Sequence, residues 1–308
     1  MCNFKYNNYD YSKKNELGKV SLNENAAGYL IDLSNVLNSK DYAPRSIRNY
    51  VQEIRLLFGY YNDVDPKDLV QKDLIHYLNF IKKEHGVGRD KCRLFAASCS
   101  FFYKFVLRSP VVFASELYPR KEFKLPEILS QEQIIKLLTS IKNPKHKLIV
   151  ALFYGTGMRL NELCHLKMEQ IDRKNAQIKI LCGKGNKDRF TLLPKYLLPE
   201  MEAYYRQYRP KNYLFEGQKL GLPLNDRSIQ HAVKLCMKMA GLEKFKFSSH
   251  SLRHSFATHL LDQGNDIHTI KELLGHSKIE TTMIYLHLQQ KKRATLCSPL
   301  DFLMNGND

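Results

Sequence analysis

Three short stretches of the sequence place basic side chains at an expected helix start or in a tight turn. TGMRLNE leads from a turn into a helix with Arg159 in its first turn, and HSLRH sets His250 and Arg253 on one face of another helix start. LGHS places His276 in the connection between two helices. A helix start offers unpaired N–H groups and the positive end of the helix dipole, so these side chains would add to an anion site. We therefore expect the three stretches to bind a phosphate or a similar anion.

Each stretch has a simpler interpretation when it is taken alone. An arginine in the first turn of a helix is usually a surface residue. His250 and His254 have the i, i+4 spacing of a zinc pair, but Ser251 stands where the metalloprotease pattern requires Glu. The GKGNK stretch is rich in glycine but lacks the spacing of a Walker loop. The sequence therefore predicts no metal and no other cofactor.

The overall charge favours a polyanionic partner. Among 308 residues, 48 Lys and Arg face 31 Asp and Glu, which gives a formal net charge of +17. Each phosphate that a basic side chain neutralises releases condensed counterions, so such a surplus promotes nucleic-acid binding. A membrane surface is the weaker alternative, because no segment approaches the roughly 18 apolar residues of a membrane span. Seven scattered cysteines without a CxxC pair, and a start without an apolar signal core, predict a cytoplasmic, nucleoid-associated protein.

The pattern of apolar residues divides the chain into two mainly helical domains. We expect a flexible segment over residues 1–20 and a helical domain over 21–118. The stretch PRKEFKLPE combines two prolines with mixed charge and predicts a linker over 119–127. A second domain is expected over 128–288, followed by a tail over 289–308. The fold class is mainly α.

The second domain changes character in its middle. NAQIKILCGKGNKDRFTLL alternates apolar and polar residues around a Gly-Lys-Gly-Asn break, which predicts a β-hairpin with Lys184 at or near its turn. Elsewhere the pattern is helical. One apolar helix is expected to end at Gly155, a short one runs from an Asp266 cap to Gly275, and a capping box at Ser277 opens the next. These elements predict a mixed α/β, mostly helical domain with a small antiparallel sheet.

In their order and spacing, four motifs resemble those of the tyrosine recombinase/phage integrase family, most closely its Xer-like members. The motifs are TGMRLNEL, GKGNKDR, HSLRHSFATHLL and LLGHSKIETTMIYLHL. The resemblance implies an N-terminal, SAM-like core-binding domain and a catalytic domain whose nucleophile is Tyr285. It also implies the rest of the active-site set, which is Arg159, Lys184, His250, Arg253 and His276, with Glu162 supporting the first arginine. Residue patterns alone do not distinguish Tyr285 among the 18 tyrosines.

The reaction that the resemblance implies is attack of the Tyr285 hydroxyl on a DNA phosphodiester, which gives a 3′-phosphotyrosyl enzyme and a 5′-hydroxyl. Arg159 and Arg253 stay protonated and can each fork onto two phosphate oxygens, while His276 is expected to donate a further hydrogen bond. The covalent intermediate stores the energy of the phosphodiester, so rejoining requires neither ATP nor a metal.

Proton transfer completes the implied mechanism. A tyrosine has an ordinary pKa of about 10, and neighbouring cations are expected to favour its phenolate form. The resemblance makes His250 the acceptor of the Tyr285 proton, and Lys184 on its hairpin the donor to the leaving oxygen.

The implied partner is double-stranded DNA with a specific recombination site. Four basic residues near helix starts or on exposed faces of the first domain are candidates for backbone contacts: Arg45, Arg48, Lys91 and Arg93. The resemblance implies a homotetramer in the synaptic complex, with a possible partner recombinase or accessory protein. The tail docks either on a neighbouring protomer or on its own domain.

Two other functions use the same features. A DNA-binding module without catalysis would keep the basic surface, but every implied catalytic position holds the required residue type. A topoisomerase would use the same chemistry and only relax DNA. Integration, excision and dimer resolution all remain open.

Overall fold

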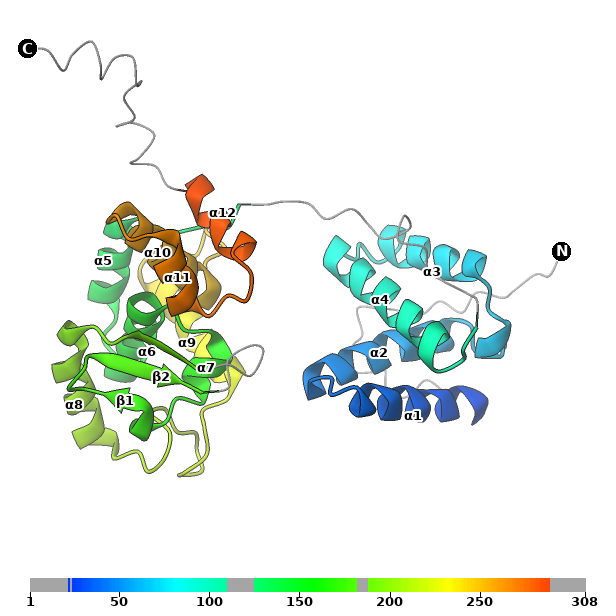
Figure 1. Cartoon of the computed structure of the whole chain (residues 1–308), viewed down its shortest axis with the longest axis horizontal. Helices are drawn as coiled ribbons and strands as arrows, with labels where there is room; N and C mark the ends of the chain where they lie inside the picture. The colour runs from blue at the N-terminus through cyan, green and yellow to red at the C-terminus, as the bar shows by residue number, and fades with distance from the viewer. Residues whose placement is uncertain (1–21, 23, 110–124, 182–187, 289–308) are drawn as a thin grey trace, which may run out of the picture. The chain divides into compact units, whose positions relative to one another are not determined.

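The computed structural model describes residue 22 and residues 24–109, 125–181 and 188–288 (Figure 1). The expected N-terminal segment, the tail, Lys184 and most of the linker lie outside these residues. The chain forms two compact units, Met1–Phe123 and Lys124–Asp308, and each is described by itself. In the ranges given, no helix is both long and apolar enough to span a membrane.

The first unit is a bundle of amphipathic helices. They are α1 (Glu24–Ser39), α2 (Pro44–Tyr60), α3 (Gln71–Lys83) and α4 (Arg89–Phe105), with a short 3₁₀ helix η1 (Pro66–Asp68). Helix α2 packs against α1 and α4, and α3 packs against α4. Their apolar faces enclose an aromatic core in which the rings of Phe58 and Phe102 meet edge to face at 5.4 Å. The expected helical N-terminal domain is confirmed.

The second unit is built around one central helix, α6 (Pro144–Thr156). Its residues 148–153 are all buried, because α6 is surrounded by other helices. Those packed on it are α5 (Gln131–Ser140), α7 (Leu160–Cys164), α8 (Leu198–Tyr208), α9 (Asp226–Met239) and α10 (Ser249–Asp262). Helices α11 (Ile267–Leu274) and α12 (Glu280–Leu288) pack on α10, and the three gather at one end of the unit (Figure 1).

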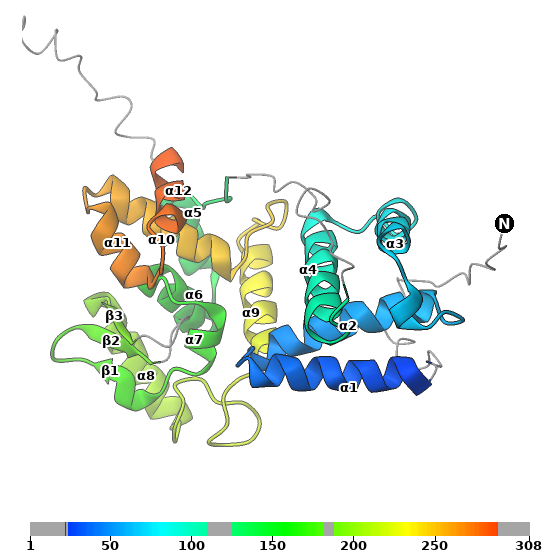
Figure 2. The ribbon, with the colours of Figure 1, turned by 45° about the vertical axis from the view of Figure 1, so that its right-hand side comes forward.

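A small antiparallel sheet lies in the same unit, with strands side by side in the order β1, β2, β3 (Figure 2). The strands are β1 (Ile171–Asp172), β2 (Gln177–Ile180) and β3 (Arg189–Leu192), and short 3₁₀ helices η3 (Met168–Gln170) and η4 (Lys195–Leu197) flank the sheet. Strands β2 and β3 pair from Gln177 with Leu192 to Ile180 with Arg189. This confirms the expected small antiparallel sheet. The last pair of this register joins Ile180 and Arg189.

Local capping explains where α11 begins and ends. The Asp266 carboxylate accepts hydrogen bonds from the backbone N–H groups of His268 and Thr269 at 2.8 and 3.0 Å, as expected of an N-cap. Gly275 ends the helix with φ of 63°, in the left-handed region that favours glycine. Both expected boundaries of this helix are confirmed.

Two other expected boundaries are wrong. Helix α6 continues through Gly155 and ends at Thr156, because Gly157 is the residue in the left-handed conformation, with φ of 63°. Helix α12 begins at Glu280, three residues after Ser277. There the carbonyl oxygen of Ile279 accepts hydrogen bonds from the backbone N–H groups of Thr282 and Met283, at 2.7 and 3.0 Å.

Candidate active site

Three arginines from separate elements converge on the end of α11. Arg159 is the N-cap residue of α7, Arg189 begins β3, and Arg253 lies in α10. We call them the arginine cluster. Each donates to one of three successive backbone oxygens: Arg189 Nε to Leu273 at 2.9 Å, Arg253 Nη2 to Leu274 at 2.7 Å, and Arg159 Nη2 to Gly275 at 3.0 Å. The last carbonyls of a helix lack intrahelical partners and carry negative partial charge, so they suit cationic donors.

Glu162 joins two members of the arginine cluster. Its carboxylate accepts both Nη1 and Nη2 of Arg189, at 2.8 and 2.7 Å, and Nη1 of Arg159 at 2.8 Å. It also accepts the backbone N–H of Arg159 at 2.7 Å. Although burial opposes it, this set of donors, with Arg189 the largest contributor among them, lowers the pKa of Glu162 to about 2. Glu162 is therefore ionised, and its carboxylate holds both the side chain and the backbone N–H of Arg159 in place.

Gly275 allows Arg189 to lie directly beneath the turn that leads to His276. A Cβ atom at Gly275 would come within 2.6 Å of Arg189 Cδ. The position also requires the left-handed backbone conformation. The LGH stretch thus needs glycine both for its turn and for the close approach of an arginine side chain.

Replacing Arg189 by alanine is expected to lower the free energy of unfolding by about 3–5 kcal/mol, because it leaves a buried carboxylate with one fewer cation. Both side chains of the Arg189–Glu162 pair are 8% exposed. Urea denaturation measures the change. As a control, Lys179→Ala removes the exposed Lys179–Asp188 pair (3.5 Å) of the same hairpin and should cost less than about 1 kcal/mol. Similar small losses for both variants would contradict a structural role for the buried pair.

The pH dependence of the free energy of unfolding also tests the Arg189–Glu162 pair. A carboxylate whose pKa is lowered by folding stabilises the protein above its ordinary pKa of 4.5, and this contribution is lost as pH falls toward about 2. Without Arg189, the pKa of Glu162 returns toward its ordinary value, so the part of the stability that is lost between about pH 4.5 and 2 should become smaller in urea denaturation followed over pH.

His276 is held in a neutral form with a defined tautomer. Its Nε2 lies 3.1 Å from Arg253 Nη2, and its Nδ1 lies 2.9 Å from Thr282 Oγ1. A guanidinium can only donate, so Nε2 accepts and the ring proton is on Nδ1, directed at Thr282. Burial, and then the charges of Arg253, Arg159 and Arg189, lower the pKa of His276 to about 3. In this arrangement His276 has no N–H group for a phosphate, in contrast to the donor role expected from the sequence.

Tyr285 is buried and protonated. It lies in α12 and is 1% exposed, with its hydroxyl 3.0 Å from Nδ1 of His254. Its ring stacks on that of His276 at a 6.4 Å centroid distance and 13°. Arg253 and Arg159 lower the pKa of Tyr285 as expected, but burial outweighs them and raises it to about 12. The expected influence of the cations is therefore confirmed, but burial decides the net shift, and the sequence does not reveal how deeply the ring is buried.

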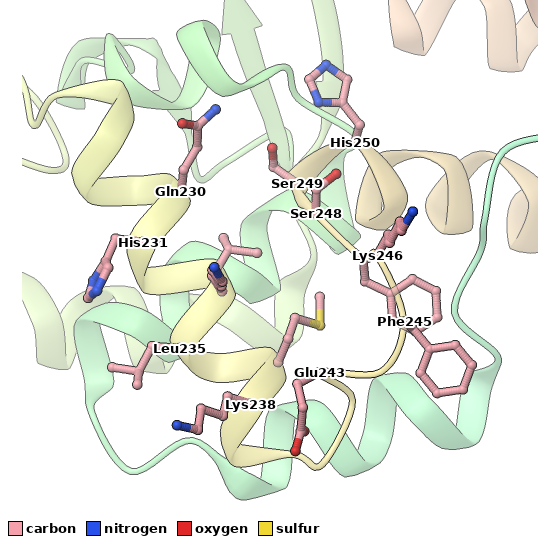
Figure 3. A pocket seen from close by; sticks show the side chains of 14 residues that line it. Gln230, His231, Leu235, Lys238, Glu243, Phe245, Lys246, Ser248, Ser249 and His250 are labelled. Atoms are coloured by element: carbon pink, nitrogen blue, oxygen red, sulfur yellow. The ribbon is translucent and has the colours of Figure 1, made fainter. Parts of the chain in front are cut away.

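His250 lies at the edge of a cavity of about 710 Å³ between α9 and the stretch that leads into α10 (Figure 3). Its side chain is exposed, at the first turn of α10. Although the residue is exposed, surrounding protein atoms remove part of the water around its ring, and this desolvation, with the charges of Arg253 and Arg159, lowers the pKa of His250. The cavity is also lined by Lys234, Lys238 and Lys246, and by Phe245. The cavity therefore presents basic and aromatic side chains next to His250.

The residues expected from the sequence divide into three groups. Arg159, Glu162, Arg253, His276 and Tyr285 are linked by the contacts described above, and His250 lies beside Arg253 at the cavity edge. Lys184 lies outside the described residues.

Two residues that contact this set were not assigned to it from the sequence. Arg189 closes the quoted GKGNKDR motif, and its position as the first residue of a strand is a signal that could have found it. The sequence pattern indicates His254 only as one half of a zinc-like histidine pair, although its place one residue after Arg253 puts it on α10 beside the site.

The candidate DNA contacts of the first unit differ in their surroundings. Arg45 and Arg48 lie exposed on α2, and Arg93 is half-buried on α4. Lys91 forms an ion pair with the buried Glu53, whose pKa burial nevertheless raises. A phosphate contact by Lys91 would compete with that pair.

Comparison with known proteins identifies the relatives of both units. Residues 127–292 match the model of the phage integrase family, and residues 30–112 match that of the phage integrase N-terminal SAM-like domain. The tyrosine recombinase XerC of Lactobacillus delbrueckii subsp. bulgaricus is 34% identical over 279 residues, which cover 84% of this chain and 93% of the relative.

Solved structures share the fold at lower identity. XerH recombinase bound to a palindromic difH substrate in a post-cleavage complex aligns with a TM-score of 0.70 and 22% identity, covering 91% of each chain. A lambda integrase tetramer bound to a Holliday junction aligns with a TM-score of 0.67 and 14% identity, covering 87% of this chain and 79% of the other.

Proposed function

Because the chain belongs to the phage integrase family and is a tyrosine recombinase of the Xer type, we propose that Tyr285 is the nucleophile with which it cleaves DNA. The observation that carries this proposal is that His276 connects Tyr285 to the arginine cluster. The ring of Tyr285 stacks on His276, which accepts a hydrogen bond from Arg253. A phenol beside fixed guanidinium groups is the arrangement that attack on a phosphodiester requires.

An enzyme of this class performs site-specific recombination by cleaving and rejoining strands. The Tyr285 oxygen would form a bond to phosphorus as the bond from phosphorus to the 5′-oxygen breaks, giving a 3′-phosphotyrosyl intermediate. A 5′-hydroxyl then attacks the intermediate and releases the tyrosine. Each step exchanges one phosphodiester for another, so no ATP is consumed.

Arg159 and Arg253 are the proposed phosphate ligands. The Arg159 side chain is 25% exposed, and its bonds to Glu162 and Gly275 leave further N–H groups for a phosphate oxygen. Arg253 is 4% exposed and is held by two carbonyls and His276. We propose that a phosphate displaces some of these bonds to Arg253. His276 would then be able to direct a proton toward the phosphate.

Lys184 is the proposed proton donor to the leaving 5′-oxygen. The β2–β3 pairing ends at Arg189, which belongs to the arginine cluster and lies five positions after Lys184 in the sequence. A lysine ammonium can supply the proton that a leaving alkoxide requires. His250 is the acceptor of the Tyr285 proton that the resemblance implies, but it is exposed beside Arg253 while the Tyr285 hydroxyl bonds to His254. We propose instead that His250 contacts the same phosphate or the adjoining strand.

Basic side chains of both units are proposed to bind the DNA backbone. In the second unit, Lys234, Lys238 and Lys246 line the cavity beside His250. In the first unit the candidates remain Arg45, Arg48, Lys91 and Arg93. A net charge of +17 supports such contacts, since counterion release favours them.

We propose that the working assembly is a homotetramer on two duplexes. The lambda integrase tetramer on a Holliday junction supports this, as a structural neighbour of the fold. We further propose domain boundaries at residues 21–118, 119–127 and 128–288, and docking of the 289–308 tail on a neighbouring protomer. A partner recombinase or accessory protein, and a cytoplasmic, nucleoid-associated location, are also proposed. Integration, excision or dimer resolution could each use this assembly.

A two-duplex assay tests recombination against simple relaxation. Two labelled duplexes carrying the chain's own recombination site should yield recombinant strands joined across duplexes, and this product should disappear when one duplex lacks the site. Relaxation of supercoiled DNA without any joined product would instead indicate a topoisomerase. Binding without covalent adduct or joined product would indicate a DNA-binding module.

A further inference from the structure

The proton of Tyr285 has a defined neighbour. Nδ1 of His254 lies 3.0 Å from the Tyr285 hydroxyl, and the ring centroids are 5.7 Å apart at 51°. His254 lies in α10 and Tyr285 in α12, two helices that pack together. The hydrogen bond therefore joins the element that carries Arg253 to the element that carries the nucleophile.

The other histidines of the site are less suited to accept this proton. Both ring nitrogens of His276 are engaged, Nε2 by Arg253 and Nδ1 by Thr282. His250 is exposed at the cavity edge, and in the described part of the chain the hydroxyl of Tyr285 bonds to His254. With its own proton on Nε2, His254 presents the Nδ1 lone pair to the phenol.

We propose that His254 accepts the proton of Tyr285 during cleavage, a role that rests on the function proposed above. The O–H bond of Tyr285 breaks, the proton moves to Nδ1 of His254, and the phenolic oxygen forms its bond to phosphorus. The 5′-oxygen leaves with a proton from Lys184. In rejoining, the His254 imidazolium returns its proton to the departing tyrosine and Lys184 recovers its own.

The charges around His254 couple this transfer to the substrate. Burial, and then the neighbouring His250 and Arg253, lower the pKa of His254 to about 4, while that of Tyr285 is raised to about 12. His276, in the connection between α11 and α12, is a further titratable neighbour of His254. These values keep the proton on Tyr285. A phosphate bound by Arg159 and Arg253 would offset their positive charge and raise the pKa of His254, so the base gains strength when DNA is in place.

Single-turnover formation of the covalent adduct on a nicked duplex, followed over pH, tests the proposal. The full-length His254→Gln variant should form adduct about 10²–10⁴-fold more slowly, because its amide cannot take up the proton. The wild-type rate should rise with pH and level off, and this rise should be lost in the variant. Added imidazole should restore adduct formation in His254→Ala, following the concentration of neutral imidazole.

His259→Gln is the matched control. His259 lies in the same helix and, like His254, is 3.0 Å from a tyrosine hydroxyl, that of Tyr154; His259 is buried, whereas His254 is half-buried. Its substitution should leave the rate within about threefold. A His254→Gln rate within about threefold of wild type would overturn the proposal, as would a slow His254→Ala that imidazole does not rescue. Failure of wild type to form adduct would instead refute the proposed function itself.

Discussion

Replacing Tyr285 by phenylalanine is expected to abolish the covalent adduct on a nicked duplex that carries the chain's own recombination site. The nick lets the 5′-hydroxyl fragment diffuse away, so wild-type protein should accumulate on the DNA. The variant keeps the ring that stacks on His276 and loses only the hydroxyl that bonds to His254. Adduct formation should fall at least about 10³-fold, since removal of a nucleophile eliminates the covalent path. Denaturing gel electrophoresis measures the result.

Tyr154→Phe provides the matched control for this loss. Tyr154 likewise bonds to a histidine of α10, the buried His259, so its substitution removes a similar hydrogen bond from the same unit. It should leave adduct formation almost unchanged. Equal adduct formation by Tyr285→Phe and wild type would show that another residue is the nucleophile.

Replacing Arg159 by alanine is expected to slow adduct formation by about 10²–10³-fold, because a fixed donor to the charge of the transition state is removed. DNA affinity should change much less, since many other basic side chains contribute to it. The substitution also releases bonds to Glu162 and the Gly275 carbonyl. Single-turnover kinetics and equilibrium binding at the same salt concentration separate the two effects.

Two further variants sharpen the interpretation of the Arg159 result. Arg206→Ala removes an arginine of α8 that is 71% exposed and pairs with Glu202, and it should cleave at the wild-type rate. Arg159→Lys keeps the charge but loses the planar fork, so it should remain well below wild type. Loss of DNA binding in parallel with cleavage would assign Arg159 a structural role.

Local signals in the sequence predicted the elements that carry the site. The alternating pattern around GKGNK predicted β2 and β3, and an Asp266 cap with a closing glycine predicted α11. The local signal did not decide which of two nearby glycines, Gly155 or Gly157, ends helix α6. Gly155 remains helical and packs against Pro194, while Gly157 takes the left-handed turn beside Phe256. That choice depends on contacts with residues far along the chain.

The site residues came from motif order, whereas their interactions came only from the fold. Arg189 bonds to Glu162, which is 27 residues away in the sequence, and to the Leu273 carbonyl at the end of α11, which is 84 residues away. No local sequence pattern indicates contacts between residues so far apart along the chain. The protonation of Tyr285 depends on burial, which opposes the cations that sequence reasoning emphasised. His254 became a candidate base because α10 and α12 pack together.

Sequencing the DNA-linked peptide tests the central claim most directly. Wild-type protein trapped on a nicked duplex can be digested with protease and nuclease, and the peptide that retains a nucleotide can be identified by mass spectrometry. The predicted peptide comes from α12 and carries the phosphodiester on the oxygen of Tyr285. A nucleotide on any other residue, such as Tyr154 or Tyr204, would contradict the assignment of Tyr285 as the nucleophile.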